Sequence, residues 1–156
     1  MADRHSAWLR VAVAGGALAA AGLFAFLVLE ARRPPGGPIE VAWDRATCAH
    51  CGMLVSDPAF AAQIHTSAGE VAVFDDPGCL LRYEHDHAPE VHARWFHHHQ
   101  ENRWIEGDRV SFLSAPRSPM GYGLVATDVG AAGALSLPQA RQRVLGRALE
   151  PEARER

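Results

Sequence analysis

The chain has 156 residues, of which 48% are hydrophobic and 21% charged, a size and composition that fit one ordinary domain and exclude a large multidomain enzyme. All 15 cationic residues are Arg, and 18 acidic residues give a formal net charge of −3, which excludes the basic surface of a nucleic-acid-binding protein. Nine His, three Cys and three Met are many for so short a chain. Because these side chains are soft and borderline metal ligands, metal binding is the first hypothesis.

The N-terminal part contains an uncharged run of 19 residues, 11–29, with Arg on both sides. As a helix this run would be roughly 28 Å long, close to the thickness of one hydrocarbon core. The run continues for ten residues past a possible cleavage site, so we expect an uncleaved signal-anchor: a transmembrane segment over residues 1–33. This predicts a single-pass membrane protein. Two Arg stand on each side of the span, so the positive-inside rule does not give the orientation of the folded domain.

The remainder is expected to be a Pro/Gly linker (34–40), a folded domain (41–149) and a solvated tail (150–156). An alternating pattern broken by Ser-Ala-Gly at 67–69 predicts a β-hairpin, and Pro77, with Asp75 and Asp76 ahead of it as caps, predicts a short helix. The order of elements indicates an α+β fold with antiparallel sheet. Further strands are expected at 91–98, 103–105, 109–113 and 122–126, and a terminal helix at 137–149 with Ser136 as its N-cap.

The densest group of chemically active side chains is Cys-Ala-His-Cys-Gly-Met at 48–53. Thiolates and thioethers are polarizable donors that select Cu(I) over hard cations, so a copper site is the favoured reading. Three alternatives stay open: a redox-active CxxC motif, a zinc site and a structural disulfide between Cys48 and Cys51. Helical periodicity does not follow Cys51, as a thioredoxin-like motif would require, and a second CxxC pair for zinc is absent from the sequence.

Four segments together resemble the NosL family, the copper-binding accessory proteins of nitrous oxide reductase maturation. They read CxxCGM, AAQIHTSAGEVAVFDDPGCLLRY, RWIEGDRVSFL and SPMGYGLVA. The resemblance runs from about residue 48 to residue 145 and implies a membrane-attached Cu(I) carrier with two small ββαβ-like halves. It implies that this carrier lies in the inner membrane, with its domain facing the periplasm or the cell exterior. It further implies that Cys51, Met53 and Met120 hold the copper. Many relatives carry a lipid-anchored Cys, in place of which this chain has the run at 11–29.

The remaining candidate ligands are expected to be secondary. Gly52 lets Cys51 and Met53 converge on one ion, so Cys51 should contribute more than Cys48. Cys79 is expected to face the core as an inert buried thiol, and His65 to be a half-buried strand residue. Consecutive strand residues point to opposite faces, so the three His at 97–99 are expected on a solvated edge.

The sequence thus predicts a membrane-anchored Cu(I) chaperone that is not an enzyme. Its expected partners are the copper ion, the membrane through the N-terminal helix, and the assembly machinery of a copper enzyme, either a transporter or the apo-enzyme. The alternative is a thiol-disulfide oxidoreductase that uses Cys48 and Cys51, and it would need neither methionine.

Overall fold

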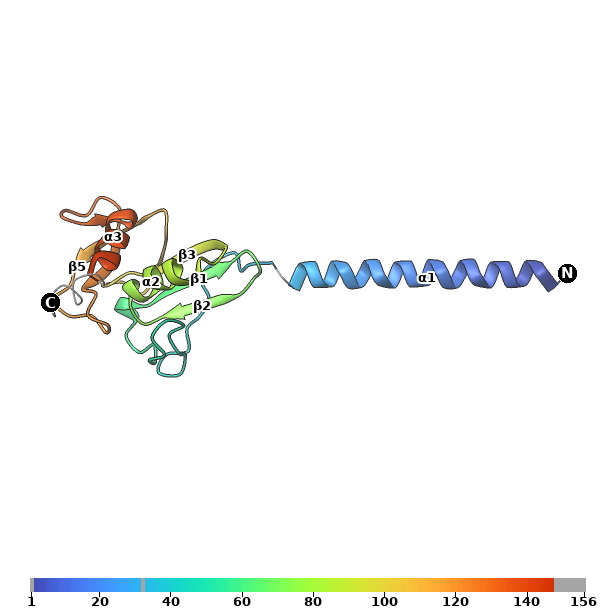
Figure 1. The fold of residues 1–156 in the computed structure, drawn as a ribbon, viewed down its shortest axis with the longest axis horizontal. Helices are drawn as coiled ribbons and strands as arrows, with labels where there is room; N and C mark the ends of the chain where they lie inside the picture. Colours follow the sequence, from blue (N-terminus) through green and yellow to red (C-terminus); the bar gives the residue numbers. More distant parts are fainter. Residues whose placement is uncertain (1, 32, 148–156) are drawn as a thin grey trace, which may run out of the picture. The chain divides into compact units, whose positions relative to one another are not determined.

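The computed structural model describes residues 2–31 and 33–147, which excludes the predicted tail and the last two residues of the predicted terminal helix (Figure 1). The chain divides into two compact units, residues 1–33 and residues 34–156. The first unit is a single helix, α1 (Ala2–Ala31), and the second holds all the strands.

The predicted transmembrane segment is wrong. Within the part of the chain that the structure describes, no helix combines the length and the apolar character needed to cross a membrane. This finding overturns the membrane helix over residues 1–33 and the inner-membrane, single-pass location that followed from it. The prediction rested on the absence of charge from residues 11–29, of which ten are Ala or Gly.

The second unit has the expected α+β character, with two antiparallel sheets. The larger sheet has the strand order β2-β1-β3-β4. Its first three strands and the helix α2 follow the chain order ββαβ, as predicted for the first half. Their bounds are β1 (Ala62–Thr66), β2 (Val71–Phe74), α2 (Pro77–His87), β3 (Val91–His97) and β4 (Trp104–Glu106).

The smaller sheet departs from the predicted second ββαβ half. Its order is β6-β5-β7, and the helix α3 follows the third strand instead of preceding it. Gly130 and Gly133 take φ values of 91° and 73°, which lets the chain turn back directly after β6 and pair again with β5. The bounds are β5 (Val110–Ser114), β6 (Leu124–Asp128), β7 (Leu135–Ser136) and α3 (Leu137–Arg147).

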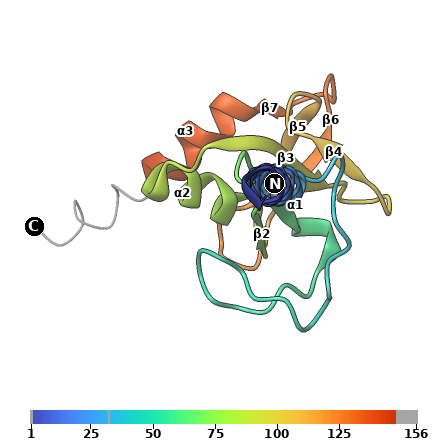
Figure 2. The same cartoon turned by 90° about the vertical axis from the view of Figure 1, so that its right-hand side faces the viewer.

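The two sheets share one hydrophobic core. Phe96 on β3 and Phe112 on β5 are both fully buried, and their rings meet edge to face with centroids 5.0 Å apart. An isolated bridge between His98 and Ala126 joins the same two regions. Figure 2 shows α2 and α3 side by side, so the helices of the two halves lie next to each other.

The first four residues of strand β1 are buried, so both faces of the strand are covered. Its polar side chains, Gln63 and His65, form hydrogen bonds within the fold. The Gln63 amide accepts a hydrogen bond from the Ile39 N–H at 2.9 Å and donates to the Ile39 carbonyl at 3.1 Å. His65 is fully buried rather than half-buried, and its Nε2 lies 2.9 Å from the Gln63 amide oxygen. The segment that leads into the domain is therefore bound to the sheet at Ile39.

The hairpin and the short helix form where the sequence predicts them. β1 and β2 pair around a turn in which Gly69 has φ 85°. Asp76 is the N-cap of α2, since its carboxylate accepts the Gly78 N–H at 2.8 Å, and Pro77 stands at the first helical position. At α3, the Ser136 N–H and hydroxyl both donate to the Gln139 side chain, which holds the start of that helix.

Candidate metal centre

Three cysteines from two separate segments meet beside the larger sheet. Cys48 and Cys51 belong to the loop before β1, and Cys79 belongs to the first turn of α2. Their three sulfur atoms all lie within 4.8 Å of one another, and no two of them form a disulfide. We call Cys48, Cys51 and Cys79 the cysteine cluster.

The loop that carries the first two thiols is closed by backbone hydrogen bonds. Thr47 and Leu54 form an antiparallel bridge, and inside it the Cys48 N–H donates to the Met53 carbonyl at 2.8 Å. Gly52 has φ 76°, a left-handed conformation that glycine adopts without a Cβ penalty. The Ala49 N–H donates to the Val73 carbonyl at 2.9 Å and attaches the loop to β2. The motif is therefore a fixed turn on the edge of the sheet, beside β2 (Figure 1).

The third thiol is placed by the start of α2. Cys79 is the third residue of the helix, where the unpaired N–H groups and the helix dipole favour negative charge on a nearby sulfur. Gly78 makes this placement possible, because a Cβ at that position would lie 2.1 Å from the ring of Tyr122. The loop before β6 therefore packs tightly on the helix start that carries Cys79.

The three thiols differ in their protonation. The pKa of Cys48 is lowered, mainly because its sulfur accepts a hydrogen bond from the Cys79 thiol, with backbone N–H groups of Cys51, Asp75 and His50 adding to the effect. The pKa of Cys79 is raised by that same hydrogen bond and by burial. Burial also raises the pKa of Cys51. Of the three thiols, Cys48 therefore loses its proton most readily.

Two buried carboxyl groups join the cysteine cluster to the loops around it. Burial raises the pKa of Asp75, and its carboxyl accepts a hydrogen bond from the backbone of Ser56. Asp76 is fully buried and accepts from the Met120 N–H at 3.2 Å as well as from Gly78. The Cys48 thiolate raises the pKa of both carboxyl groups. These neighbouring negative charges repel one another, so a bound cation would relieve the repulsion.

The four predicted ligands, Cys48, Cys51, Met53 and Met120, differ from one another in burial and in their place relative to the cysteine cluster. Cys48 is buried and Cys51 is half-buried, and both belong to the cluster. The Met53 N–H donates to the sulfur of Cys51, while its side chain is 51% exposed. Met120 is 38% exposed and is attached through its backbone to Asp76. Ligation by the two methionines stays a prediction.

Cys79 is predicted to be a buried, inert thiol; its burial is confirmed, and its inertness stays a prediction. The residue is fully buried, as expected, yet the atoms around its sulfur include two further thiols. One signal in the sequence pointed to this placement. A Cys two residues after Asp-Pro lies in the first turn of a helix, next to the N-cap at Asp76.

The histidine run, residues 97–99, is not on a solvated edge. His97 and His98 are buried, and the ring of His97 meets the rings of Trp43 and Trp104 edge to face. The Nδ1 atom of His98 accepts the N–H groups of Gln100 and Glu101, at 3.2 and 3.1 Å. These histidines hold the chain after β3 by hydrogen bonds.

A hollow of about 450 Å³ opens between the loop that carries His50 and the helix α2. His50, which stands between the two cysteines of the loop, lines it together with Met120 and Val144. Arg82 and Asp86, which are 3.2 Å apart, line it from α2.

Comparison of the chain with protein-family models, with curated proteins and with solved structures finds no match. The three cysteines are close enough to hold one metal ion, and this is what the geometry itself establishes.

Proposed function

We propose that this chain is a Cu(I) carrier that binds the ion at the cysteine cluster and delivers it during the assembly of a copper enzyme. The observation that carries the proposal is the convergence of the sulfur atoms of Cys48, Cys51 and Cys79 within 4.8 Å. Cys48 and Cys51 lie three positions apart in one loop, whereas Cys79 lies in the helix α2. The convergence of the three sulfur atoms is therefore a property of the fold.

The number and kind of donors favour Cu(I) over zinc. Structural zinc is bound by four ligands in a tetrahedral arrangement. Among the described residues, the group close enough to share one ion comprises three cysteines, without a fourth His, Cys, Asp or Glu. Thiolate donors are the soft ligands that select Cu(I). A three-sulfur site therefore suits a soft ion of low coordination number.

A carrier must also release its ion, and the exposure of the ligands fits that requirement. Cys48 and Cys79 are buried, whereas Cys51 is partly exposed and lies beside the exposed side chains of Met53 and Leu54. A thiol of a recipient protein could therefore attack the metal from the side of Cys51 and replace the ligands one at a time. The two buried cysteines would keep the ion bound until that exchange begins.

The recipient is proposed from the sequence motifs. The resemblance of the CxxCGM, FDD and PMG segments to the NosL family suggests nitrous oxide reductase or the machinery that assembles it. The methionines implied by that resemblance, Met53 and Met120, would act as weaker additional ligands during transfer.

The alternative, a thiol-disulfide oxidoreductase, fits the geometry less well. Such enzymes place a reactive, accessible thiolate first in the CxxC motif. Here the first cysteine, Cys48, has the lowered pKa but is buried, while the more exposed Cys51 has a raised pKa. In addition, the motif lies in a turn and does not begin a helix.

Titration of the full chain with Cu(I) under anaerobic, reducing conditions tests the proposal. We expect one Cu(I) per chain and, in X-ray absorption, a first shell made of sulfur. A parallel titration with Zn(II) should show weaker binding. A first shell of oxygen and nitrogen, or tighter binding of Zn(II) than of Cu(I), would overturn the copper site.

A further inference from the structure

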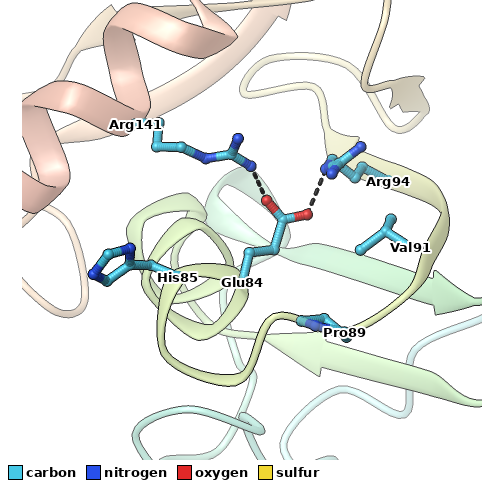
Figure 3. A pocket seen from close by; sticks show the side chains of 6 residues that line it. All are labelled: Glu84, His85, Pro89, Val91, Arg94 and Arg141. Carbon is cyan, nitrogen blue, oxygen red and sulfur yellow. Dashed lines mark hydrogen bonds and ion pairs between the residues drawn. The ribbon is translucent and has the colours of Figure 1, made fainter.

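A second hollow, of about 310 Å³, lies at the other end of α2 from Cys79. Figure 3 shows Glu84 at its centre, with the guanidinium groups of Arg94 and Arg141 directed at the carboxylate from opposite sides. Arg94 comes from β3 and Arg141 from α3. Pro89 and Val91 form an apolar wall, and His85 also lines the hollow.

Each oxygen of the Glu84 carboxylate accepts a hydrogen bond from one of the two arginines. Its side chain is 6% exposed, its Oε1 accepts from Arg94 Nε, and its Oε2 accepts from Arg141 Nη2. A buried carboxylate is stable only when it is paired and hydrogen-bonded, and Glu84 meets both conditions. The group therefore links α2, β3 and α3 and fixes the position of both arginines.

The two guanidinium groups retain charge and donors after this pairing. Each guanidinium carries five N–H donors, and in the described part of the chain one nitrogen of each is bonded to an acceptor, Glu84. Two positive charges face one negative charge, so the hollow carries a net positive charge within a chain whose net charge is −3. The side chains of Arg94 and Arg141 are 31% and 38% exposed, so a ligand can reach them.

We propose that Arg94 and Arg141 form a binding site for a small molecule that carries an oxyanion, either a carboxylate or a phosphate group. Guanidinium groups bind both oxyanions through paired, charge-assisted hydrogen bonds. Glu84 holds the two arginines in place before the ligand arrives, which lowers the entropic cost of binding. The hollow also has an apolar wall at Pro89 and Val91 for the carbon part of a ligand.

This site is separate from the cysteine cluster and does not depend on the proposed copper function. The competing explanation is that the Arg-Glu-Arg group only braces the two helices against the sheet. That explanation predicts no saturable anion binding, and it predicts that changes in the arginines alter stability alone.

The test is calorimetric titration of the full chain with inorganic phosphate and, separately, with succinate. We expect saturable binding of at least one of them, weakened about tenfold or more in Arg141→Gln and in Arg94→Gln, because each loses a charge-assisted contact. The matched control is Arg143→Gln on the same helix, whose guanidinium donates to Ser114.

Arg141→Lys provides a second variant in case Arg141→Gln does not fold. It keeps the ion pair with Glu84 but lacks the planar fork, so we expect weaker anion binding with little change in thermal unfolding. Stronger binding of phosphate than of succinate would identify a phosphate-bearing ligand, and the reverse a carboxylate-bearing one. No saturable binding, or an equal loss in Arg143→Gln, would overturn the site.

Discussion

The cysteine cluster and the histidine run show how differently a fold can use two sets of metal-binding residues. The histidines are three consecutive residues, whereas Cys48 and Cys79 stand 31 positions apart. In the structure the distant thiols converge within 4.8 Å, and the adjacent imidazoles are occupied by hydrogen bonds to the surrounding chain. Density in the sequence is therefore a poor guide to which residues can share a metal ion.

The difference comes from the availability of lone pairs. The Nδ1 atom of His98 accepts two backbone N–H groups, so its proton must stand on Nε2, which then cannot coordinate a metal. His99 uses its Nδ1 toward the Ala126 carbonyl at 2.9 Å. In the cysteine cluster, by contrast, the hydrogen bonds run between the thiols themselves, and a metal ion can replace their protons.

The largest expected effect is the loss of Cu(I) binding in Cys48→Ser. The Cys48 sulfur is one of the three donors within 4.8 Å, and its lowered pKa favours the thiolate that binds Cu(I), so we expect a loss of affinity beyond about a hundredfold, the upper range for an outer-shell partner. Competition with a Cu(I) chelator measures it. A loss smaller than that in Cys51→Ser would restore the ranking expected from the sequence, in which Cys51 contributes more.

The next largest effect distinguishes the cluster from a site built on the loop alone. Cys79→Ser should weaken Cu(I) binding at least about tenfold, because it removes one of three sulfur donors. His98→Gln is the matched control from the histidine run and should leave the affinity unchanged. Equal affinity of Cys79→Ser and the unaltered chain would show that Cys79 is inert after all.

Met53→Ala and Met120→Ala should each weaken Cu(I) binding by less than the cysteine changes. Both side chains are substantially exposed, and a neutral thioether binds Cu(I) more weakly than a thiolate. If both methionines contact the ion, the double variant should show coupling rather than a simple sum of effects. Silent methionines, together with unchanged sulfur coordination in X-ray absorption, would confine the site to the three cysteines.

Substitutions in the histidine run should lower the free energy of unfolding, whereas substitutions in the cysteine cluster should weaken metal binding. His98→Ala removes the acceptor of two partly buried N–H groups and should cost about 1 kcal/mol in the free energy of unfolding. Urea denaturation measures this cost. His92→Ala, at an exposed position on β3, is the control and should stay within about 0.5 kcal/mol. A metal-affinity change in His98→Ala would break the distinction between the two regions.

The smallest effect is a pH dependence of stability. Burial lowers the pKa of His65 and of His98 below the ordinary value of 6.5, so both stay neutral in the folded chain at a pH where the unfolded chain takes up protons. The unfolded state then binds more protons, so stability falls as the pH decreases from 7 through 6.5 toward the folded-state values. Urea denaturation at pH 7 and pH 5 should show this fall, and His98→Gln should reduce it.

Local features of the second unit were predictable from the sequence. The hairpin between β1 and β2, the cap of α2 at Asp76 and the turn at Gly52 depend on residues within a few positions of one another. Turn and cap chemistry act over such short distances, so the pattern of residue types suffices. The same holds for the identity of the CxxC loop as a soft-metal candidate.

Tertiary structure alone decided which distant residues meet. Cys79 lies close to Cys48 and Cys51 because α2 starts directly beside the loop. The carboxyl groups just before α2 accept hydrogen bonds from the backbone of Ser56 and of Met120. His98 and His99 form hydrogen bonds to backbone groups, and the hydrophobic periodicity of the sequence does not predict these contacts. The contacts of Glu84 with Arg94 and Arg141 depend on the packing of α2 against β3 and α3. Such contacts depend on the packing of whole elements, whereas residue patterns along the chain report the preferences of each element separately.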